Sequence, residues 1–329
     1  MTGITRRALY AGALLPFLPG GARADTTTWD AYVYNPVASI AAVQCVQRII
    51  DTVREKTNGA LVTNLHLGGS LPISATNITQ AVADGVVQFG DDGFATGNVP
   101  ISAILRLPML LQNDAELAKA MAILLPYLQR DYAKKGVVVL GQYSYPFQVI
   151  WGRKKITSLA DIKGLKLRVT SVEQGEFIRR FGGVALTMGS PDVAAALDRG
   201  VVDGALTASS GGGVIWKDLL KYRYAFPTCY VNSTLVVNQD ALDKLPSATQ
   251  QIVRDAAAEN ATWATTQMNI REDQITAQMG KDGMVLTPAS ADDIKLATEK
   301  LQPYWDEWAK AHGPEALEVM AKLRAMTGR

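Results

Sequence analysis

The amino-acid sequence predicts an α/β protein built as two lobes, and three observations lead to this prediction. Strand and helix patterns alternate from Trp29 to Phe89, and they alternate again from Leu165 to Thr207. Each order of strand, helix, strand, helix and strand implies parallel strands joined by right-handed crossovers. The third observation is a helical pattern from Ala248 to Gly280. At 1.5 Å per residue it would be roughly 50 Å long, enough to brace both lobes.

The first 24 residues differ from the rest of the chain. Arg6 and Arg7 precede an apolar run from Ala8 to Leu18, and small residues at positions 22 and 24 suit signal cleavage after Ala24. We therefore expect residues 1–24 to be an export signal and the mature protein to be periplasmic. The arginine pair fits both the general secretory route and the twin-arginine route.

The composition is that of an ordinary globular protein with a sizeable core. Of the 329 residues, 48% are hydrophobic and 19% are charged, which gives no indication of disorder. Removal of the signal takes three arginines and leaves 30 basic residues against 31 acidic ones. The sequence has no basic stripe with interleaved aromatic residues, so we expect no nucleic-acid partner.

The first lobe is expected to begin with a strand from Trp29 to Tyr34. Helices at 37–57 and 75–83 then alternate with strands at 60–67 and 86–89. Ligands of parallel sheets bind outside the carboxyl ends of the strands, so residues that follow these strands should border a crevice. On this lobe they are Asn35, Asp92 and Phe94.

The second lobe should contain a strand from Leu165 to Val169, in which apolar residues alternate with two cations, the second being Arg168. Ser171 and Gln174 form a capping-box pattern for the helix that follows. The next helix should be capped by Ser190, with a proline and an acidic residue in its first turn. The crevice residues predicted on this lobe are Arg168, Met188, Ser190 and Thr207.

Two further strand patterns connect the lobes. One runs from Val137 to Ile150 and the other returns from Cys229 to Val237, so each lobe should hold a mixed sheet flanked by helices. Helical patterns end the chain. The predicted boundaries are 25–145 with 234–272 for lobe I, 146–233 with 273–300 for lobe II, and 301–329 for C-terminal helices that pack on the body.

Side chains suited to nucleophilic or metal catalysis are scarce. The chain has two histidines, His66 and His312, and no serine-hydrolase, zinc-protease, P-loop or dinucleotide motif. We therefore expect a binding protein rather than an enzyme, with no cofactor and no metal.

Cys45 and Cys229 give no spacing that indicates a disulfide. Arg168 offers a planar fork suited to a carboxylate, although a surface arginine paired with an acid fits the same spacing.

Two motifs resemble those of one family of transport proteins. Residues 158–169, SLADIKGLKLRV, and residues 196–204, ALDRGVVDG, are similar to motifs in the solute-binding subunits of tripartite ATP-independent periplasmic (TRAP) transporters. The resemblance extends over essentially the whole mature chain. It implies a type II-like periplasmic binding protein whose two lobes close on an organic acid, with the carboxylate paired to Arg168. It also implies delivery of that acid to integral-membrane subunits driven by an ion gradient.

Three positions depart from the family pattern. Gln148 stands where members that bind sialic acid carry a second arginine, and Ser190 replaces an aromatic residue. Leu206-Thr207 replaces a pair that begins with glutamate, which argues against a metal-bridged keto acid. With one cation, we expect a monocarboxylate, bulky or aromatic, rather than a dicarboxylate or sialic acid. Hydrogen bonds are expected from Gln148, Thr207 and Asn35, and an apolar wall from Phe94.

Two alternatives to transport stay open on the sequence. The first is a ligand-sensing periplasmic partner of a membrane receptor, which would share the binding site and differ only in its downstream partner. The second is an enzyme on the same scaffold, which would show turnover and is disfavoured by the scarcity of histidine and nucleophile motifs. In each case we expect a monomer.

Overall fold

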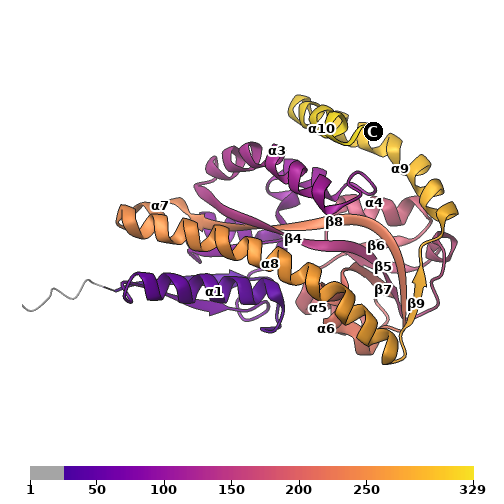
Figure 1. Ribbon diagram of the computed structural model, residues 1–329, viewed down its shortest axis with the longest axis horizontal. Coiled ribbons are helices and arrows are strands. Elements are labelled where there is room, and N and C mark those ends of the chain that lie inside the picture. The colour runs from indigo at the N-terminus through magenta and orange to yellow at the C-terminus, as the bar shows by residue number, and fades with distance from the viewer. Residues whose placement is uncertain (1–25) are drawn as a thin grey trace, which may run out of the picture.

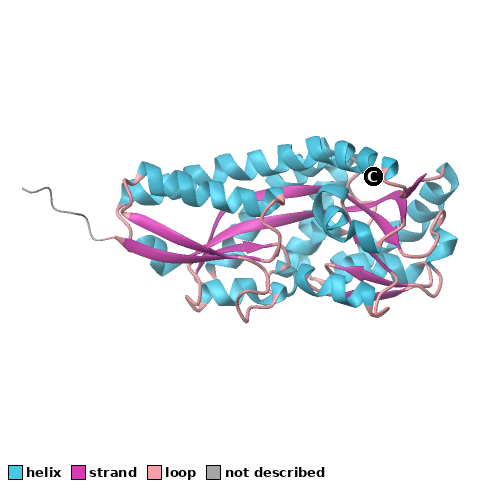
Figure 2. Cartoon of the chain, turned by 90° about the horizontal axis from the view of Figure 1, so that it is seen from below, coloured by secondary structure: helices cyan, strands magenta, loops and turns pink. Residues whose placement is uncertain are grey.

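The protein folds as two lobes along one long axis, as the computed structural model shows for residues 26–329 (Figure 1). The predicted export signal, residues 1–24, lies outside these described residues. Within residues 26–329 no helix is long and apolar enough to span a membrane. The predicted α/β class is confirmed, because a mixed sheet with helices on its faces runs through both lobes (Figure 2).

Nine strands form one continuous sheet in the order β2-β1-β3-β8-β4-β7-β5-β6, with β9 paired to β8. Three parallel strands lie in lobe I and three in lobe II. The long strands β4 and β8 run antiparallel to each other through both lobes. The strands are β1 (Thr27–Val33), β2 (Leu61–His66), β3 (Phe89–Asp92), β4 (Val137–Gly152), β5 (Lys166–Val169), β6 (Val184–Thr187), β7 (Gly204–Thr207), β8 (Tyr222–Asn238) and β9 (Val285–Pro288).

The pairing of β4 with β8 becomes irregular where the two lobes meet. Tyr145 pairs with Val231 and Gln148 pairs with Cys229, so the register shifts between these two positions. Pro146 lies in the irregular stretch and has no N–H to contribute to the ladder. Irregularities of this kind bend a strand, so the sheet changes direction between the lobes.

Helix α8, which has 35 residues, matches the predicted brace across both lobes. It packs against α1 in lobe I and against the turn of residues 209–213 in lobe II. There the carboxylate of Glu272 accepts the backbone N–H groups of Ser209 and Ser210 at 2.9 and 2.8 Å. The helices are α1 (Ala41–Lys56), α2 (Ile78–Ala83), α3 (Asp114–Ala133), α4 (Val172–Arg180), α5 (Ser190–Asp198), α6 (Val214–Trp216), α7 (Gln239–Asp243), α8 (Ser247–Lys281), α9 (Ala291–Ala311) and α10 (Pro314–Thr327).

Two predicted boundaries are wrong, and β9 is absent from the predicted strands. The strand placed at 86–89 is β3, which begins only at position 89. Gly85 adopts a φ of +70° at the end of α2, and the N–H of Val86 then bonds back to Ala81 instead of entering the sheet. The residue that caps α5 is Gly189 rather than Ser190, which is already helical.

Helices α9 and α10 fold back over the body from lobe II toward lobe I (Figure 1). Trp305 and Trp308 of α9 are both buried. The indole N–H of Trp305 donates to the carbonyl oxygen of Pro108 in lobe I at 2.8 Å, and that of Trp308 donates to Glu173 in lobe II at 3.1 Å. These two bonds attach one helix to both lobes.

Trp305→Ala should destabilise the protein, because it removes a fully buried side chain and the hydrogen bond to Pro108. We expect the free energy of unfolding to fall by about 3–5 kcal/mol. Leu317→Ala on α10 is the control, since Leu317 is 45% exposed and should change stability by no more than about 0.5 kcal/mol. Denaturant unfolding of both variants measures the difference, and equal losses would contradict this account of α9.

Candidate functional site

A cavity lies between the two lobes. Lobe I supplies residues that follow β1 and β3, lobe II supplies the ends of β5 and β7 with the start of α5, and β4 and β8 contribute a third side. This is the strand-end position at which α/β sheets bind ligands. The lining residues are Tyr34, Asn35, Gly93, Phe94, Tyr145, Gln148, Arg168, Thr170, Ser190, Thr207, Gly212, Trp216 and Val231.

Two sequence motifs fix the strand that carries Arg168. Asp203 donates its N–H to the carbonyl oxygen of Lys166 at 2.7 Å, and its carboxylate accepts the N–H of Lys166 at 3.0 Å. The loop before β7 is thereby locked to the start of β5. Gly204 follows, and a Cβ there would lie 2.0 Å from the carbonyl oxygen of Trp151, so glycine is required. The resulting register sets Arg168 at the cavity end of β5.

The guanidinium of Arg168 is buried without a carboxylate partner. Arg168 is 4% exposed, and its Nε donates to the carbonyl oxygen of Met188 at 3.0 Å. Its guanidinium carbon lies 5.1 Å from the ring centre of Trp216 and 5.9 Å from that of Phe94. Within residues 26–329, no Asp or Glu oxygen comes within 4.0 Å of it. Burial lowers the pKa of Arg168 to about 10, so the group stays charged at neutral pH.

Arg106 is a second buried cation, placed away from the cavity wall. It is 2% exposed and donates to the carbonyl oxygens of Gly93 and Asn232. Burial lowers the pKa of Arg106, whereas the negative charge of Glu173 acts in the opposite direction. Its charge adds to the positive potential around Arg168 and lowers the pKa of that group. Of these two cations, only Arg168 reaches the space where a ligand would lie.

The start of α4 links Arg106 to the cavity. Ser171 caps this helix through the N–H of Gln174, as predicted. The predicted return bond is displaced by one residue, because Gln174 Oε1 accepts the N–H and the hydroxyl of Thr170 at 2.7 and 2.8 Å. The oxygen of that hydroxyl accepts from Arg106 Nη1 at 3.1 Å. Thr170 of lobe II is therefore tied to Arg106 of lobe I beside the cavity.

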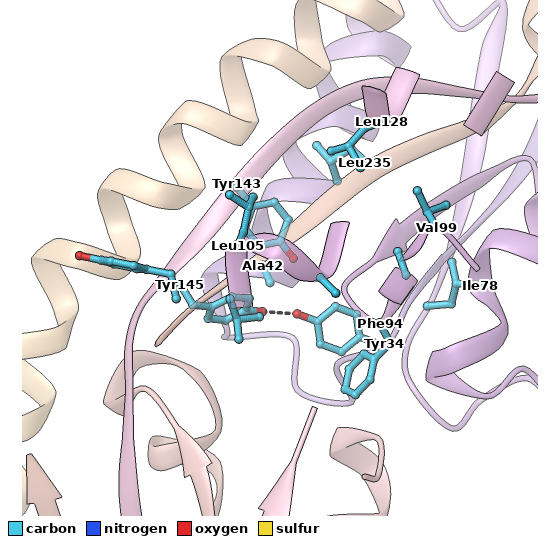
Figure 3. Close-up of a cluster of buried hydrophobic side chains, with 14 of the residues drawn as sticks. Tyr34, Ala42, Ile78, Phe94, Val99, Leu105, Leu128, Tyr143, Tyr145 and Leu235 are labelled. Carbon is cyan, nitrogen blue, oxygen red and sulfur yellow. Dashed lines mark hydrogen bonds between the residues drawn. The ribbon is translucent and has the colours of Figure 1, made fainter. Parts of the chain in front are cut away.

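Two tyrosine hydroxyls meet at the cavity wall (Figure 3). The oxygens of Tyr34 and Tyr145 lie 2.7 Å apart, and Asn35 Nδ2 donates to Tyr145 at 3.1 Å. The ring of Phe94 meets that of Tyr34 edge to face, with centres 5.3 Å apart. An amide NH₂ group only donates, so Asn35 orients the hydroxyl pair from lobe I.

The chain matches the family model of bacterial extracellular solute-binding proteins, family 7, over residues 40–311. The chain belongs to this family. It is a solute-binding protein and not an enzyme, and the resemblance to TRAP solute-binding subunits is confirmed. A monocarboxylate 2-oxoacid-binding periplasmic protein of Nostoc is 24% identical to it over 285 residues, which cover 84% of this chain and 76% of the relative. The C4-dicarboxylate-binding protein DctP of Rhodobacter capsulatus is 25% identical over 195 residues, 58% of each chain.

Solved structures share the fold of this solute-binding protein. DctP7 of Bordetella pertussis, an extracytoplasmic solute receptor binding pyroglutamic acid, superposes with a TM-score of 0.85 at 26% identity, over 91% of this chain and 100% of that one. A TRAP solute-binding protein of Desulfovibrio salexigens with bound orotic acid gives a TM-score of 0.82 at 19% identity, over 91% and 99%. The predicted two-lobe fold of a periplasmic binding protein is confirmed.

Six of the eight predicted ligand residues lie on the cavity wall of the solute-binding protein. Met188 contributes a backbone carbonyl that holds Arg168, while its side chain packs within lobe II. The structure corrects the placement of Asp92, because its carboxylate accepts from Thr79 of α2 and Tyr132 of α3 inside lobe I. The six on the wall are Asn35, Phe94, Gln148, Arg168, Ser190 and Thr207.

Several lining residues escape the sequence reasoning. Tyr34 and Tyr145 have the pattern of ordinary aromatic residues in strands, and Trp216 follows the glycine run 211–213, which matches no motif. Residues 209–213 form a π-helical turn in which Gly212 packs on the indole, since a Cβ there would lie 2.2 Å from a ring carbon of Trp216. A glycine run just before a tryptophan is the signal that could have identified this wall.

Asp91 and Asp92 are buried together in lobe I. Asp91 accepts hydrogen bonds from Tyr143 at 2.8 Å and from Ser233, yet burial dominates and raises the pKa of Asp91 to about 7. Burial likewise raises the pKa of Asp92 to about 6. These carboxyl groups therefore belong to the interior of lobe I, and neither is among the residues that line the cavity.

The state of both cysteines is described within residues 26–329. Cys45 and Cys229 are both buried and free, so they form no disulfide with each other. The thiol of Cys229 accepts a hydrogen bond from Gln174 Nε2 at 3.4 Å. In the same residues, no cluster of three or more His, Cys, Asp or Glu side chains could hold a metal ion.

Asp91→Asn should make stability less dependent on pH. The folded state keeps the Asp91 proton up to about pH 7, whereas the unfolded chain releases it near its usual value of about 3.9. The wild-type free energy of unfolding should therefore fall as pH rises from 4 to 7, with an Asp91 contribution of up to about 1.4 kcal/mol per pH unit. Denaturant unfolding at several pH values measures both slopes. The exposed control Asp218→Asn should keep the wild-type slope, and an unchanged slope in Asp91→Asn would contradict the assignment.

Proposed function

We propose that this solute-binding protein captures an organic monocarboxylate between its lobes, holds the carboxylate on Arg168, and delivers the acid to TRAP-type membrane subunits. The lining residues of both lobes complete the site. Hydrogen bonds come from Asn35, Gln148, Ser190 and Thr207, and Phe94 forms an apolar wall. The carbonyl oxygen of Met188 supports the proposal indirectly, because it orients the guanidinium.

The unpaired guanidinium of Arg168 is the observation that carries the proposal. A buried ionised group without a counter-charge is costly. The carbonyl oxygen of Met188 and the aromatic faces of Phe94 and Trp216 satisfy part of it. A carboxylate would complete the site with two parallel charge-assisted hydrogen bonds, which is the geometry for which a guanidinium is suited.

One cation on the cavity wall favours one carboxylate in the ligand. Among the described residues that line the cavity, Arg168 is the only Lys or Arg. Gln148 is neutral, and its amide already donates to the carbonyl oxygen of Pro146 at 3.0 Å. A second carboxylate would therefore lose its hydration without gaining a counter-charge. The names of the Nostoc relative and the Bordetella receptor, a monocarboxylate binder and a pyroglutamic acid binder, agree with this choice.

Closure of the lobes follows from the position of the site. Ligand contacts come from both lobes, so a bound acid stabilises the closed arrangement, and charge-assisted bonds strengthen as water leaves the cavity. We assign residues 25–145 and 234–272 to lobe I and residues 146–233 and 273–300 to lobe II. Residues 301–329 form the C-terminal helices that pack on the body. The mature protein acts as a periplasmic monomer after removal of residues 1–24.

A thermal-shift screen should separate monocarboxylates from dicarboxylates of matched length. A ligand present at 100 times its dissociation constant adds about 2.7 kcal/mol to stability, which raises the melting temperature measurably. We expect monocarboxylates such as pyroglutamate or 2-oxo acids to give the larger shifts. Shifts confined to dicarboxylates would overturn the assignment of a single charged contact.

Arg168→Met should abolish most of the affinity for the best monocarboxylate while the protein stays folded. Methionine fills the space between the aromatic rings but carries no charge. Loss of one partner of a buried charge pair costs about 2 kcal/mol or more, which is about a 30-fold weaker affinity. Isothermal titration calorimetry measures the loss. Arg199→Met, at an exposed arginine of the same lobe, should bind normally, and normal binding by Arg168→Met would refute the proposal.

A further inference from the structure

Two polar groups on the cavity wall have no hydrogen-bond partner within residues 26–329. They are the hydroxyl of Ser190 and the indole N–H of Trp216, both in lobe II. Ser190 is 5% exposed and Trp216 is 2% exposed. Buried polar groups of native proteins are almost always paired, and leaving one unpaired costs free energy. Because both residues line the cavity, the missing partner can come from the ligand.

The indole of Trp216 is fixed in its position. Gly212 packs so closely on the ring that a Cβ there would lie 2.2 Å from a ring carbon. The guanidinium of Arg168 lies over the ring, 5.1 Å from its centre. The N–H is therefore presented in one direction, and it is a donor that cannot accept a hydrogen bond.

The carboxylate on Arg168 does not account for this N–H. A cation over an indole lies above the ring face, whereas the N–H points outward in the plane of the ring. An acceptor for the N–H of Trp216 lies in that plane, whereas the guanidinium lies over the ring face. A second acceptor atom on the ligand would satisfy this N–H.

Ser190 also lines the cavity from lobe II and favours the same kind of atom. It lies in the first turn of α5, a helix of nine residues, and its hydroxyl caps nothing because Gly189 occupies the capping position. The start of a helix favours atoms that carry partial negative charge. A free hydroxyl at that place suits an uncharged oxygen acceptor.

We propose that the ligand is a monocarboxylic acid with a second, uncharged acceptor oxygen, such as a ring-amide, keto or hydroxyl oxygen, which is bound by Trp216 and Ser190. This inference rests on the proposed function and deepens it. Arg168 selects acids from other solutes, and the two donors select among acids. Plain alkyl and aryl carboxylates leave both donors unpaired, so the site favours oxygenated acids over the merely bulky or aromatic acids expected from the sequence.

Pairs of acids that differ only in the second oxygen test the inference. 3-Oxocyclopentanecarboxylate is compared with cyclopentanecarboxylate, and 2-oxobutanoate with butanoate, by titration calorimetry on the mature protein. An unpaired buried donor weakens binding by roughly 5- to 150-fold, so the wild type should prefer the oxygenated member of at least one pair by that factor. Trp216→Phe and Ser190→Ala keep the ring and the backbone but remove the donors, and each should lose most of that preference.

The controls separate failure of the inference from failure of the proposed function. Arg199→Met, at an exposed residue outside the cavity wall, should keep the wild-type preference within each pair. Equal binding of both members of each pair, or equal losses for both members in Trp216→Phe and Ser190→Ala, would overturn the second acceptor and leave Arg168 as the anchor. Binding of no acid in any pair would overturn the proposed function itself. Ser190→Ala keeps the test valid if Trp216→Phe folds poorly.

Discussion

A guanidinium enclosed between two lobes without a carboxylate beside it is the constraint on which the rest of this structure depends. Arg168 retains its charge despite burial, and the chain supplies it with one carbonyl oxygen and two aromatic faces. The strand that carries it is held in register by Asp203 and by a glycine for which no other residue could substitute. The chain thus fixes the position of Arg168 but compensates its charge only in part. An anionic ligand would supply the missing counter-charge.

The two lobes are held together by more than the two strands that cross between them. Helix α8 reaches from α1 to the turn at 209–213, and α9 bonds to both lobes through Trp305 and Trp308. Near the cavity, Arg106 adds a cross-lobe bond to Thr170. A ligand between the lobes therefore adds its contacts to an arrangement that the protein already favours, and less of its binding free energy is spent on ordering the site.

The sequence predicts a cavity residue best where a local strand or helix pattern also determines where that residue lies in the fold. Arg168 ends a short alternating strand next to a capped helix, so the strand-end rule located it. Asp92 also lies at a strand end, yet it faces α2 and α3, because position along a strand does not say which face packs on a helix. Arg106 is surrounded by apolar residues in the sequence and gives no periodic signal. Tyr145 and Trp216 reach the wall from distant segments, which only the tertiary fold brings together.

The path of the chain also governs the order in which the protein can fold. Strand β3 of lobe I has β8 as its neighbour, and Asp91 reaches Ser233 across 142 residues of sequence. Lobe I is thus incomplete until the chain has passed through lobe II and returned. Contacts so far apart in sequence slow folding, since a long loop must close before they form. No fragment that ends before β8 can build the pocket, so recognition of the ligand is a property of the nearly complete chain.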